Sequence, residues 1–171
     1  MIIIIVSWLL SSQNLTVLVV DNGSPYVRDI TLCLDNLGQI HELKKYDEVF
    51  LLSDYQKVIL SGRRKNKKEI NSINSKIIKT CFTNETPVLG ICYGAEIIAL
   101  TFGGSLHKTD LIQGFNRINI EKPTKLLEKN HCNVYESHSY AISHLPENFI
   151  CVASSATSKH EIICHNSKRI F

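Results

Sequence analysis

Hydrophobic and polar residues are grouped in blocks along the first part of the chain, and the spacing inside each block predicts an element. Residues 16–20 and Lys57–Leu60 are short β-prone runs, which are typical of strands. Between these runs, apolar residues recur at the spacing of one helix face: Val27, Ile30, Leu34 and Leu37. Gly38 then predicts the end of that helix, and residues 40–43 predict a further short strand. Strands that alternate with helices indicate a parallel sheet covered on both faces.

A second helical pattern follows, and the last third of the chain then changes character. The helical pattern has these apolar positions: Ile70, Ile73, Ile77 and Cys81. Beyond residue 104, short β-prone runs are separated by polar turns, at residues 105–107, 116–120, 133–136, 150–155 and 161–165, with Ile170 starting one more. We expect these runs to make antiparallel additions to the parallel core. The predicted fold class is therefore α/β, with an open parallel sheet and antiparallel C-terminal additions.

Residues 87–104 join a strand pattern to a helical pattern through a sharp turn that contains Cys92. Gly90 and Gly94 flank the cysteine, and such glycines are needed where a nucleophile is held on a strained strand-to-helix turn. A helix N-terminus also favours a thiolate over a thiol, so we expect an activated nucleophile. The alternative is a cysteine buried in an ordinary turn, because free cysteines are often core residues.

Composition and charge narrow the class of protein. The 171 residues fit one domain, the hydrophobic share is 44%, and the net charge of +3 is too small to indicate nucleic-acid binding. The six cysteines show neither metal-ligand spacing nor a disulfide framework, so we expect no metal and a reducing, cytoplasmic setting. Residues 1–10 are apolar but too short for a membrane span. We interpret residues 1–15 as an extension, either an upstream start or an added edge strand, before a domain of residues 16–171.

Five of the six residues 63–68 are basic, and only Asn66 interrupts them. Cations oppose the dipole in the first turn of a helix, so we expect this run in the loop before the second helix. The carboxyl ends of parallel strands form the ligand crevice of an open α/β sheet, which would bring the run near Cys92. A solvated surface run is the alternative.

Several segments together resemble the class I glutamine amidotransferases. The turn Gly90-Ile91-Cys92-Tyr93-Gly94 is similar to the nucleophile motif of that family, and other segments follow in the family's order: Val20-Asp21-Asn22-Gly23, Val58-Ile59-Leu60-Ser61-Gly62, Ser137-His138-Ser139 and Leu145-Pro146-Glu147-Asn148-Phe149. The resemblance extends from about Val17 onward and is strongest to the glutaminase subunits of archaeal-type GMP synthases. It implies a flavodoxin-like fold, glutamine as the substrate and no cofactor.

The resemblance also implies roles for individual residues. Cys92 would attack the glutamine amide, and backbone N–H groups of Gly62, Arg63 and Tyr93 would form the oxyanion hole. The segment Ser137, His138 and Ser139, together with Glu96, would contact the substrate. The ammonia would pass to an ATP-dependent synthetase of the ATP pyrophosphatase type, most simply in GMP synthesis, and neither nucleic acid nor a membrane is implied.

Three departures from the family pattern affect this interpretation. Arg63 stands where the family usually has glycine, and Glu96 stands where it usually has glutamine. An ionised Glu96 is close enough in the chain to raise the thiol pKa of Cys92. Either Glu96 binds the substrate amide or ammonia, or glutamine is not the natural substrate, or Glu96 merely faces solvent. No His-Pro-Glu motif, which supplies the family's general base, is present. We therefore expect a domain that is incomplete at its C-terminal end and has little activity as it stands.

Three other functions remain open. The chain could be a non-catalytic relative that binds or regulates a partner, or a cysteine hydrolase acting on γ-glutamyl or peptide bonds. Within the family, the partner could instead be an anthranilate or aminodeoxychorismate synthase.

Overall fold

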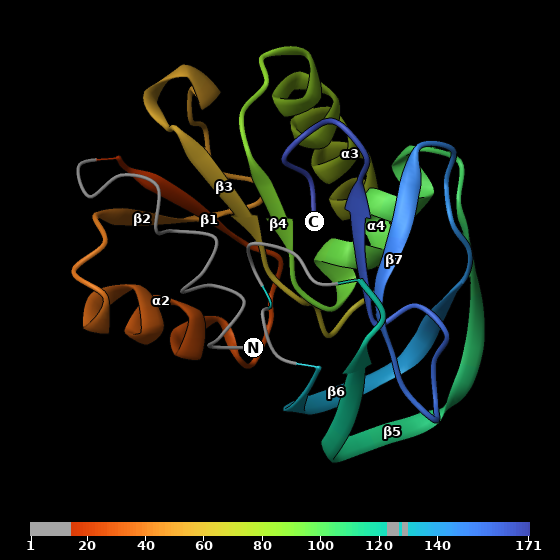
Figure 1. The fold of residues 1–171 in the computed structure, drawn as a ribbon. Coiled ribbons are helices and arrows are strands. Elements are labelled where there is room, and N and C mark those ends of the chain that lie inside the picture. The colour runs from red at the N-terminus through yellow and green to blue at the C-terminus, as the bar shows by residue number, and fades with distance from the viewer. Residues whose placement is uncertain (1–14, 123–126, 128–129) are drawn as a thin grey trace.

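A parallel sheet forms the centre of the protein in the computed structural model, which describes residues 15–122, 127 and 130–171. Its strands are β1 (Val17–Asp21), β2 (His41–Lys45), β3 (Lys57–Leu60) and β4 (Val88–Gly90). They lie in the order β2-β1-β3-β4, and every neighbouring pair is parallel (Figure 1). The predicted strand at residues 40–43 is confirmed with a shift of one to two residues.

Helices cover both faces of this sheet, because successive residues of its strands point to opposite sides. Leu18 and Val20 of β1 belong to the hydrophobic cluster that includes helices α3 (Lys68–Thr83) and α4 (Tyr93–Thr101). Val17 and Val19 belong to the cluster on the other face, with helix α2 (Val27–Asn36). A short 3-10 helix, η1 (Leu52–Asp54), precedes β3. The predicted end of α2 is confirmed by Gly38, which has φ of +63°.

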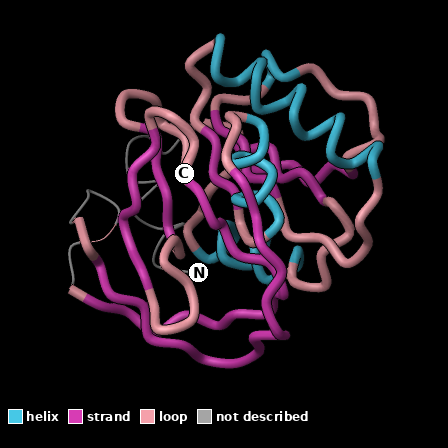
Figure 2. Tube along the Cα trace, turned by 90° about the vertical axis from the view of Figure 1, so that its right-hand side faces the viewer, coloured by secondary structure: helices cyan, strands magenta, loops and turns pink. Residues whose placement is uncertain are grey.

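An antiparallel sheet follows α4 in the chain, and Figure 2 shows its strands in magenta. It consists of β5 (Ser105–Ile120), β6 (His131–His144), β7 (Phe149–Ser154) and β8 (Ile162–His165), in the order β6-β5-β7-β8. The predicted runs at 105–107 and 116–120 are one strand. Register shifts at Ser105/Leu106 and Lys108/Ile112 let β5 stay paired with β6 across the polar residues between the two runs.

The last residues return to the parallel sheet. Ile170 forms a parallel bridge with Val88, the N–H of Gly90 donates to the carbonyl of Phe171 at 2.8 Å, and that of Phe171 donates to Val88 at 3.0 Å. Phe171 therefore lies beside the last residue of β4, next to the turn that carries Cys92. This observation agrees with the predicted start of a strand at Ile170.

Two further predictions concern segments at the ends of helices and of the chain. The basic run lies in a loop only as far as Lys67, because α3 begins at Lys68; the prediction of a loop is wrong for that one residue. Apart from Leu15, the proposed N-terminal extension lies outside the described residues. No helix in the described part of the chain is long and apolar enough to cross a membrane.

Candidate active site

Cys92 occupies a strained turn between β4 and α4. Its φ of +55° and ψ of −114° lie outside the regions that non-glycine residues prefer. The two neighbouring glycines are required by close backbone contacts: a Cβ on Gly90 would lie 2.4 Å from the carbonyl carbon of Gly94, and one on Gly94 would lie 2.2 Å from the carbonyl oxygen of Leu60. The turn therefore holds Cys92 at the carboxyl end of the parallel sheet.

Backbone groups surround the thiol. The N–H of Tyr93 hydrogen-bonds to the sulfur of Cys92, and a Cβ placed on Gly62 would lie only 3.6 Å from the Cβ of Cys92. β3 ends at Leu60, the buried Ser61 comes next, and Gly62 follows it. The ends of two adjacent parallel strands thus bring Gly62, Arg63 and Tyr93 to one side of Cys92.

The pKa of the Cys92 thiol is raised to about 11, whereas the helix N-terminus by itself predicts a pKa shift in favour of the thiolate. Displacement of water by surrounding protein is the largest cause of this pKa increase, and the charge of Glu96 is the next. The N–H of Tyr93 and the charge of Arg63 lower the pKa, but by less. Cys92 as a residue is exposed, so reagents can reach it although its sulfur is poorly hydrated. Among the described residues, the charged groups that act on this thiol do not include a histidine.

Glu96 lies one turn into α4 and is half-buried, rather than facing solvent. Burial raises the pKa of its carboxyl group, while the charges of Arg63 and His138 lower that pKa. It lines the same cavity as Cys92. Its pKa is therefore set by the residues of the site, and it in turn opposes ionisation of the cysteine.

Arg63 lies against the ring of Tyr93, with the guanidinium carbon 3.8 Å from the ring centroid. Both side chains donate to Oδ1 of Asn71 on α3, Arg63 from Nη1 at 2.5 Å and Tyr93 from its hydroxyl at 2.9 Å. This cluster holds the Arg63 side chain against Tyr93 and α3. The sequence contained no signal for Asn71, because its partners are 8 and 22 positions away.

A buried amide pair supports Gly62 from behind. Asn22 Nδ2 donates to the carbonyl of Ser61 at 3.1 Å, and its backbone N–H donates to the Ser61 hydroxyl at 2.9 Å. Asn74 on α3 donates to Oδ1 of Asn22 at 2.7 Å. All three residues are buried, so the network fixes the loop after β1 against the loop after β3. Asn74 is a polar residue on the apolar face of the second predicted helix, and this position could have indicated a buried hydrogen-bonding role.

Ser137, His138 and Ser139 lie within β6, which extends beyond the predicted run at residues 133–136. Ser137 pairs with Gln113 and His138 pairs with Ile112, while Ser139 falls at a register shift in that pairing. Ser137 and His138 line the cavity beside Cys92. The strand is longer than predicted because β5 supplies a partner along its whole length.

Two cavities meet at Cys92. One, of about 200 Å³, lies between the two sheets and is lined mainly by apolar side chains, and its carboxyl and imidazole groups come from these residues: Glu96, Glu136, His138, His160 and Glu161. The other, of about 810 Å³, is an open cleft lined by Gly62, Arg63 and Arg64 on one side and by Phe115 and Tyr135 on the other. Arg64 thus brings the start of the basic run to the rim of the cysteine site. The smaller cavity is acidic and the larger cleft has basic residues.

A family model described as "Glutamine amidotransferase class-I" matches residues 18–171. The chain belongs to the class I glutamine amidotransferases. It is 33% identical over 138 residues to a GMP synthase [glutamine-hydrolyzing] from Petrotoga mobilis, covering 78% of this chain and 26% of that protein. A GMP synthase from Hamiltonella defensa is 28% identical over 169 residues, with 91% of this chain and 32% of that protein covered. The chain therefore spans about a third or less of these two relatives.

Solved structures agree with this membership of the amidotransferases. A GMP synthase subunit from Thermoplasma acidophilum superposes with a TM-score of 0.80 at 28% identity, covering 91% of this chain and 80% of that chain. A glutamine amidotransferase from Thermotoga maritima has a TM-score of 0.77 at 16% identity, covering 93% of this chain and 74% of that chain, a likeness of fold. The predicted α/β fold, with a parallel sheet flanked by helices and an antiparallel C-terminal sheet, is confirmed.

Proposed function

We propose that this amidotransferase domain hydrolyses the side-chain amide of glutamine through Cys92 and supplies the ammonia to a synthetase. The observation that carries the proposal is the position of Cys92, held at positive φ with the N–H of Tyr93 at its sulfur and Gly62 beside it. In this mechanism the thiolate attacks the amide carbon, and N–H groups of Gly62, Arg63 and Tyr93 stabilise the oxyanion. Ammonia leaves with an added proton, and water then cleaves the thioester to glutamate.

Substrate contacts are assigned to the cavity that Cys92 shares with β6. Ser137 and His138 line it, and Glu96 faces it from α4. We place the glutamine between β6 and α4. Ser139 lies at the register shift of β6, and we assign it an indirect role, in setting the course of the strand beside the substrate. Glu96 accepts a hydrogen bond from the amide nitrogen or from departing ammonia.

A general base is required, because a thiol with a pKa of about 11 is almost wholly protonated at neutral pH. Phe171 lies beside Gly90 in the parallel sheet, so residues appended after it would reach the carboxyl edge near Cys92. We expect a version extended with the family's His-Pro-Glu segment to release glutamate about 10²- to 10⁴-fold faster than the 171-residue chain. Substantial glutamate release by the 171-residue chain, abolished by Cys92→Ala, would contradict this and make His138 the first candidate base.

Labelling by glutamine analogues tests the nucleophile itself. In the extended version, acivicin or diazo-oxonorleucine should modify Cys92 faster than the other exposed or half-buried cysteines, Cys132 and Cys151. Iodoacetamide, which lacks the amino-acid part, is the matched control and should discriminate less between the three. Label found mainly on Cys151 by peptide mapping would argue against a glutamine site at Cys92.

The partner proposal rests on the two GMP synthases above, of which this chain spans about a third or less. We propose an ATP pyrophosphatase-type synthetase that aminates XMP and docks at the rim of the open cleft. Arg64 lines that cleft, and Lys65, Lys67 and Lys68 follow it in the chain and are exposed as Arg64 is. Their charges suit an acidic surface or a nucleotide phosphate. Changing these four residues to Ser should weaken binding and glutamine-dependent synthesis, while ammonia-dependent synthesis stays unchanged. Binding as tight as wild type at low ionic strength would locate the interface elsewhere.

A non-catalytic role is the second candidate, and one observation favours it: burial and Glu96 both hold the thiol in its protonated form. Such a protein would bind a synthetase without releasing glutamate. An extended version that binds its partner but leaves glutamine intact, with or without Glu96→Gln, would select this role over catalysis.

A further inference from the structure

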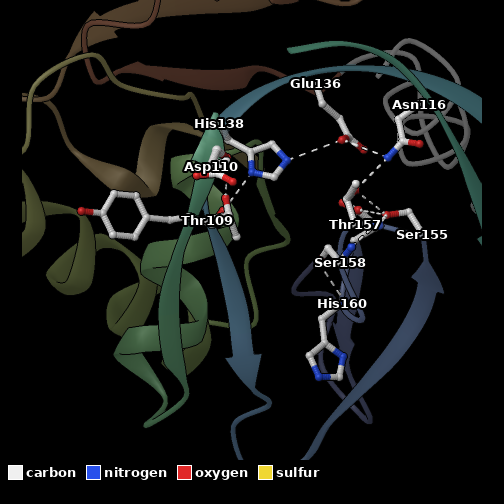
Figure 3. A network of polar contacts seen from close by, with 11 residues as sticks. Thr109, Asp110, Asn116, Glu136, His138, Ser155, Thr157, Ser158 and His160 are labelled. Carbon is white, nitrogen blue, oxygen red and sulfur yellow. Dashed lines mark hydrogen bonds and ion pairs between the residues drawn. The ribbon is translucent and has the colours of Figure 1, made fainter. Parts of the chain in front are cut away.

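Three side chains that the proposed reaction does not require as a group converge near the acidic cavity. Glu136 and His138 come from β6, and Glu161 comes from the turn just before β8. One possible metal-ligand atom from each lies within 4.8 Å of the other two. Figure 3 shows the Glu136 and His138 side chains pointing toward one another.

His138 is oriented as a metal ligand is. Its Nδ1 lies 2.9 Å from the carbonyl oxygen of Tyr140, which can only accept, so Nδ1 carries a proton and the lone pair of the neutral imidazole is on Nε2. Nε2 lies 3.6 Å from Oε2 of Glu136, inside the cluster. A backbone carbonyl that fixes the tautomer in this way is the usual support for a histidine that binds a metal.

Glu136 supplies a separate and independent observation. The residue is 7% exposed, and its Oε1 is buried with no hydrogen-bond partner among the described residues. Its other oxygen, Oε2, accepts from Nδ2 of Asn116 at 3.2 Å, which holds the carboxylate in place. A buried carboxylate oxygen without a partner is costly, and a cation is the group that satisfies it best.

Hydrogen bonds within the turn between β7 and β8 hold the Glu161 side chain. Its Oε1 accepts from the hydroxyl of Ser155 at 2.5 Å. The hydroxyl oxygen of Ser155 also accepts from the backbone N–H groups of Thr157 and Ser158, both at 3.0 Å. One oxygen of each carboxylate is thus occupied by an orienting bond, which leaves the other oxygen available.

We infer that Glu136, His138 and Glu161 bind a divalent metal ion, with Zn²⁺ as the first candidate. One imidazole and two carboxylates form a nitrogen and oxygen ligand set that suits Zn²⁺ and neighbouring transition metals, and three protein ligands leave a position for water. The ion joins β6 to the turn between β7 and β8. An internal ion pair between His138 and Glu136 is the competing explanation, but it leaves Oε1 of Glu136 unsatisfied.

Metal titration of the full chain, stripped with chelator and kept reduced, tests the inference. We expect one Zn²⁺ per chain at this site and a higher melting temperature with Zn²⁺ than without it. His138→Asn and Glu161→Gln should each weaken Zn²⁺ binding by about 10-fold or more and abolish the thermal shift. Glu161→Gln keeps the size of the side chain and its bond from Ser155, so it decides the matter if His138→Asn folds poorly.

Two controls separate this site from adventitious binding. The double variant His107→Asn/Glu147→Gln removes an exposed histidine and an exposed carboxylate elsewhere, and it should bind Zn²⁺ as the wild type does. Co²⁺ is the spectroscopic probe, because thiolate ligands give a strong charge-transfer band and this site should not. Absence of stoichiometric Zn²⁺, a thiolate band in the Co²⁺ complex, or unchanged affinity in Glu161→Gln would overturn the inference.

Discussion

The two sides of the Cys92 site are held by different kinds of interaction. On the elbow side, the backbone itself sets the geometry: Gly94 lies against the carbonyl of Leu60, and Cys92 takes a strained conformation between β4 and α4. On the β6 side, side chains do the positioning, as Asn116 does for Glu136. A backbone contact tolerates no added atom, whereas a side-chain bond can be lost while the strand stays paired. We therefore expect the elbow side to be much less tolerant of substitution.

The largest expected effect comes from breaking the elbow side with Gly94→Ala. The new Cβ would lie 2.2 Å from the carbonyl oxygen of Leu60, so α4 and β3 must separate. We expect the free energy of unfolding to fall by about 3 kcal/mol in urea denaturation. Gly103→Ala is the control: Gly103 has φ of +93° but nothing within 4 Å of its added Cβ, so we expect a loss of only about 1 kcal/mol. Equal losses in both variants would show that crowding at the elbow is unimportant.

The corresponding change on the β6 side is Asn116→Ala. It removes the bonds from Nδ2 to Glu136 at 3.2 Å and to Thr157 at 3.0 Å, while β5 and β6 keep their backbone pairing. We expect a loss of about 1 kcal/mol in the free energy of unfolding, measured in the same denaturation. A loss as large as that of Gly94→Ala would contradict the proposed difference between the two sides.

This difference also explains which features could be predicted from the sequence. The bounds of β3 and the glycine after α2 were predicted because each depends on a short run of neighbouring residues. The turn at Cys92 was predicted because its two glycines and the flanking apolar patterns lie within a few positions. Local backbone constraints leave local sequence signals.

Features that depend on distant residues could not be predicted in this way. β5 is a single strand because β6 pairs with it across its polar middle, which no local pattern indicates. Asn22 and Asn74 meet although 52 positions separate them. Glu161 reaches Glu136 and His138 only because the turn before β8 packs against β6. The raised thiol pKa likewise follows from burial by several elements together, whereas the sequence indicated only the helix N-terminus and Glu96.

Removing the charge of Glu96 sharpens the electrostatic side of the comparison. Its carboxylate raises the pKa of Cys92, so Glu96→Gln should lower that pKa and increase the thiolate fraction at any pH below it. A decrease of about one unit in the thiol pKa increases the thiolate fraction about tenfold. Because a more acidic thiol is a weaker nucleophile, we expect alkylation at pH 8 to become only about fourfold faster. The measurement is the iodoacetamide reaction rate of Cys92 as a function of pH. A midpoint that does not move would mean that solvent screens Glu96 from the thiol.

Arg63→Gln should change the same rate in the opposite direction and by less. The Arg63 charge lowers the thiol pKa of Cys92, but it ranks below Glu96 among the causes of the pKa change. Its guanidinium carbon also lies 3.8 Å from the Tyr93 ring centroid, and Nη1 donates to Asn71. These contacts hold the guanidinium in place, so it does not move closer to the thiolate. We expect alkylation of Cys92 at pH 8 to slow about twofold, because the thiolate loses a nearby cation.

Two controls support this interpretation. Gln keeps a donor that can reach Asn71, so a loss of fold is not the expected cause of a slower rate. The double variant Glu96→Gln/Arg63→Gln provides the check: if the two charges act on the thiol independently, its rate should be the product of the two single effects. A rate equal to that of Glu96→Gln alone would mean that Arg63 acts on Cys92 only by neutralising Glu96.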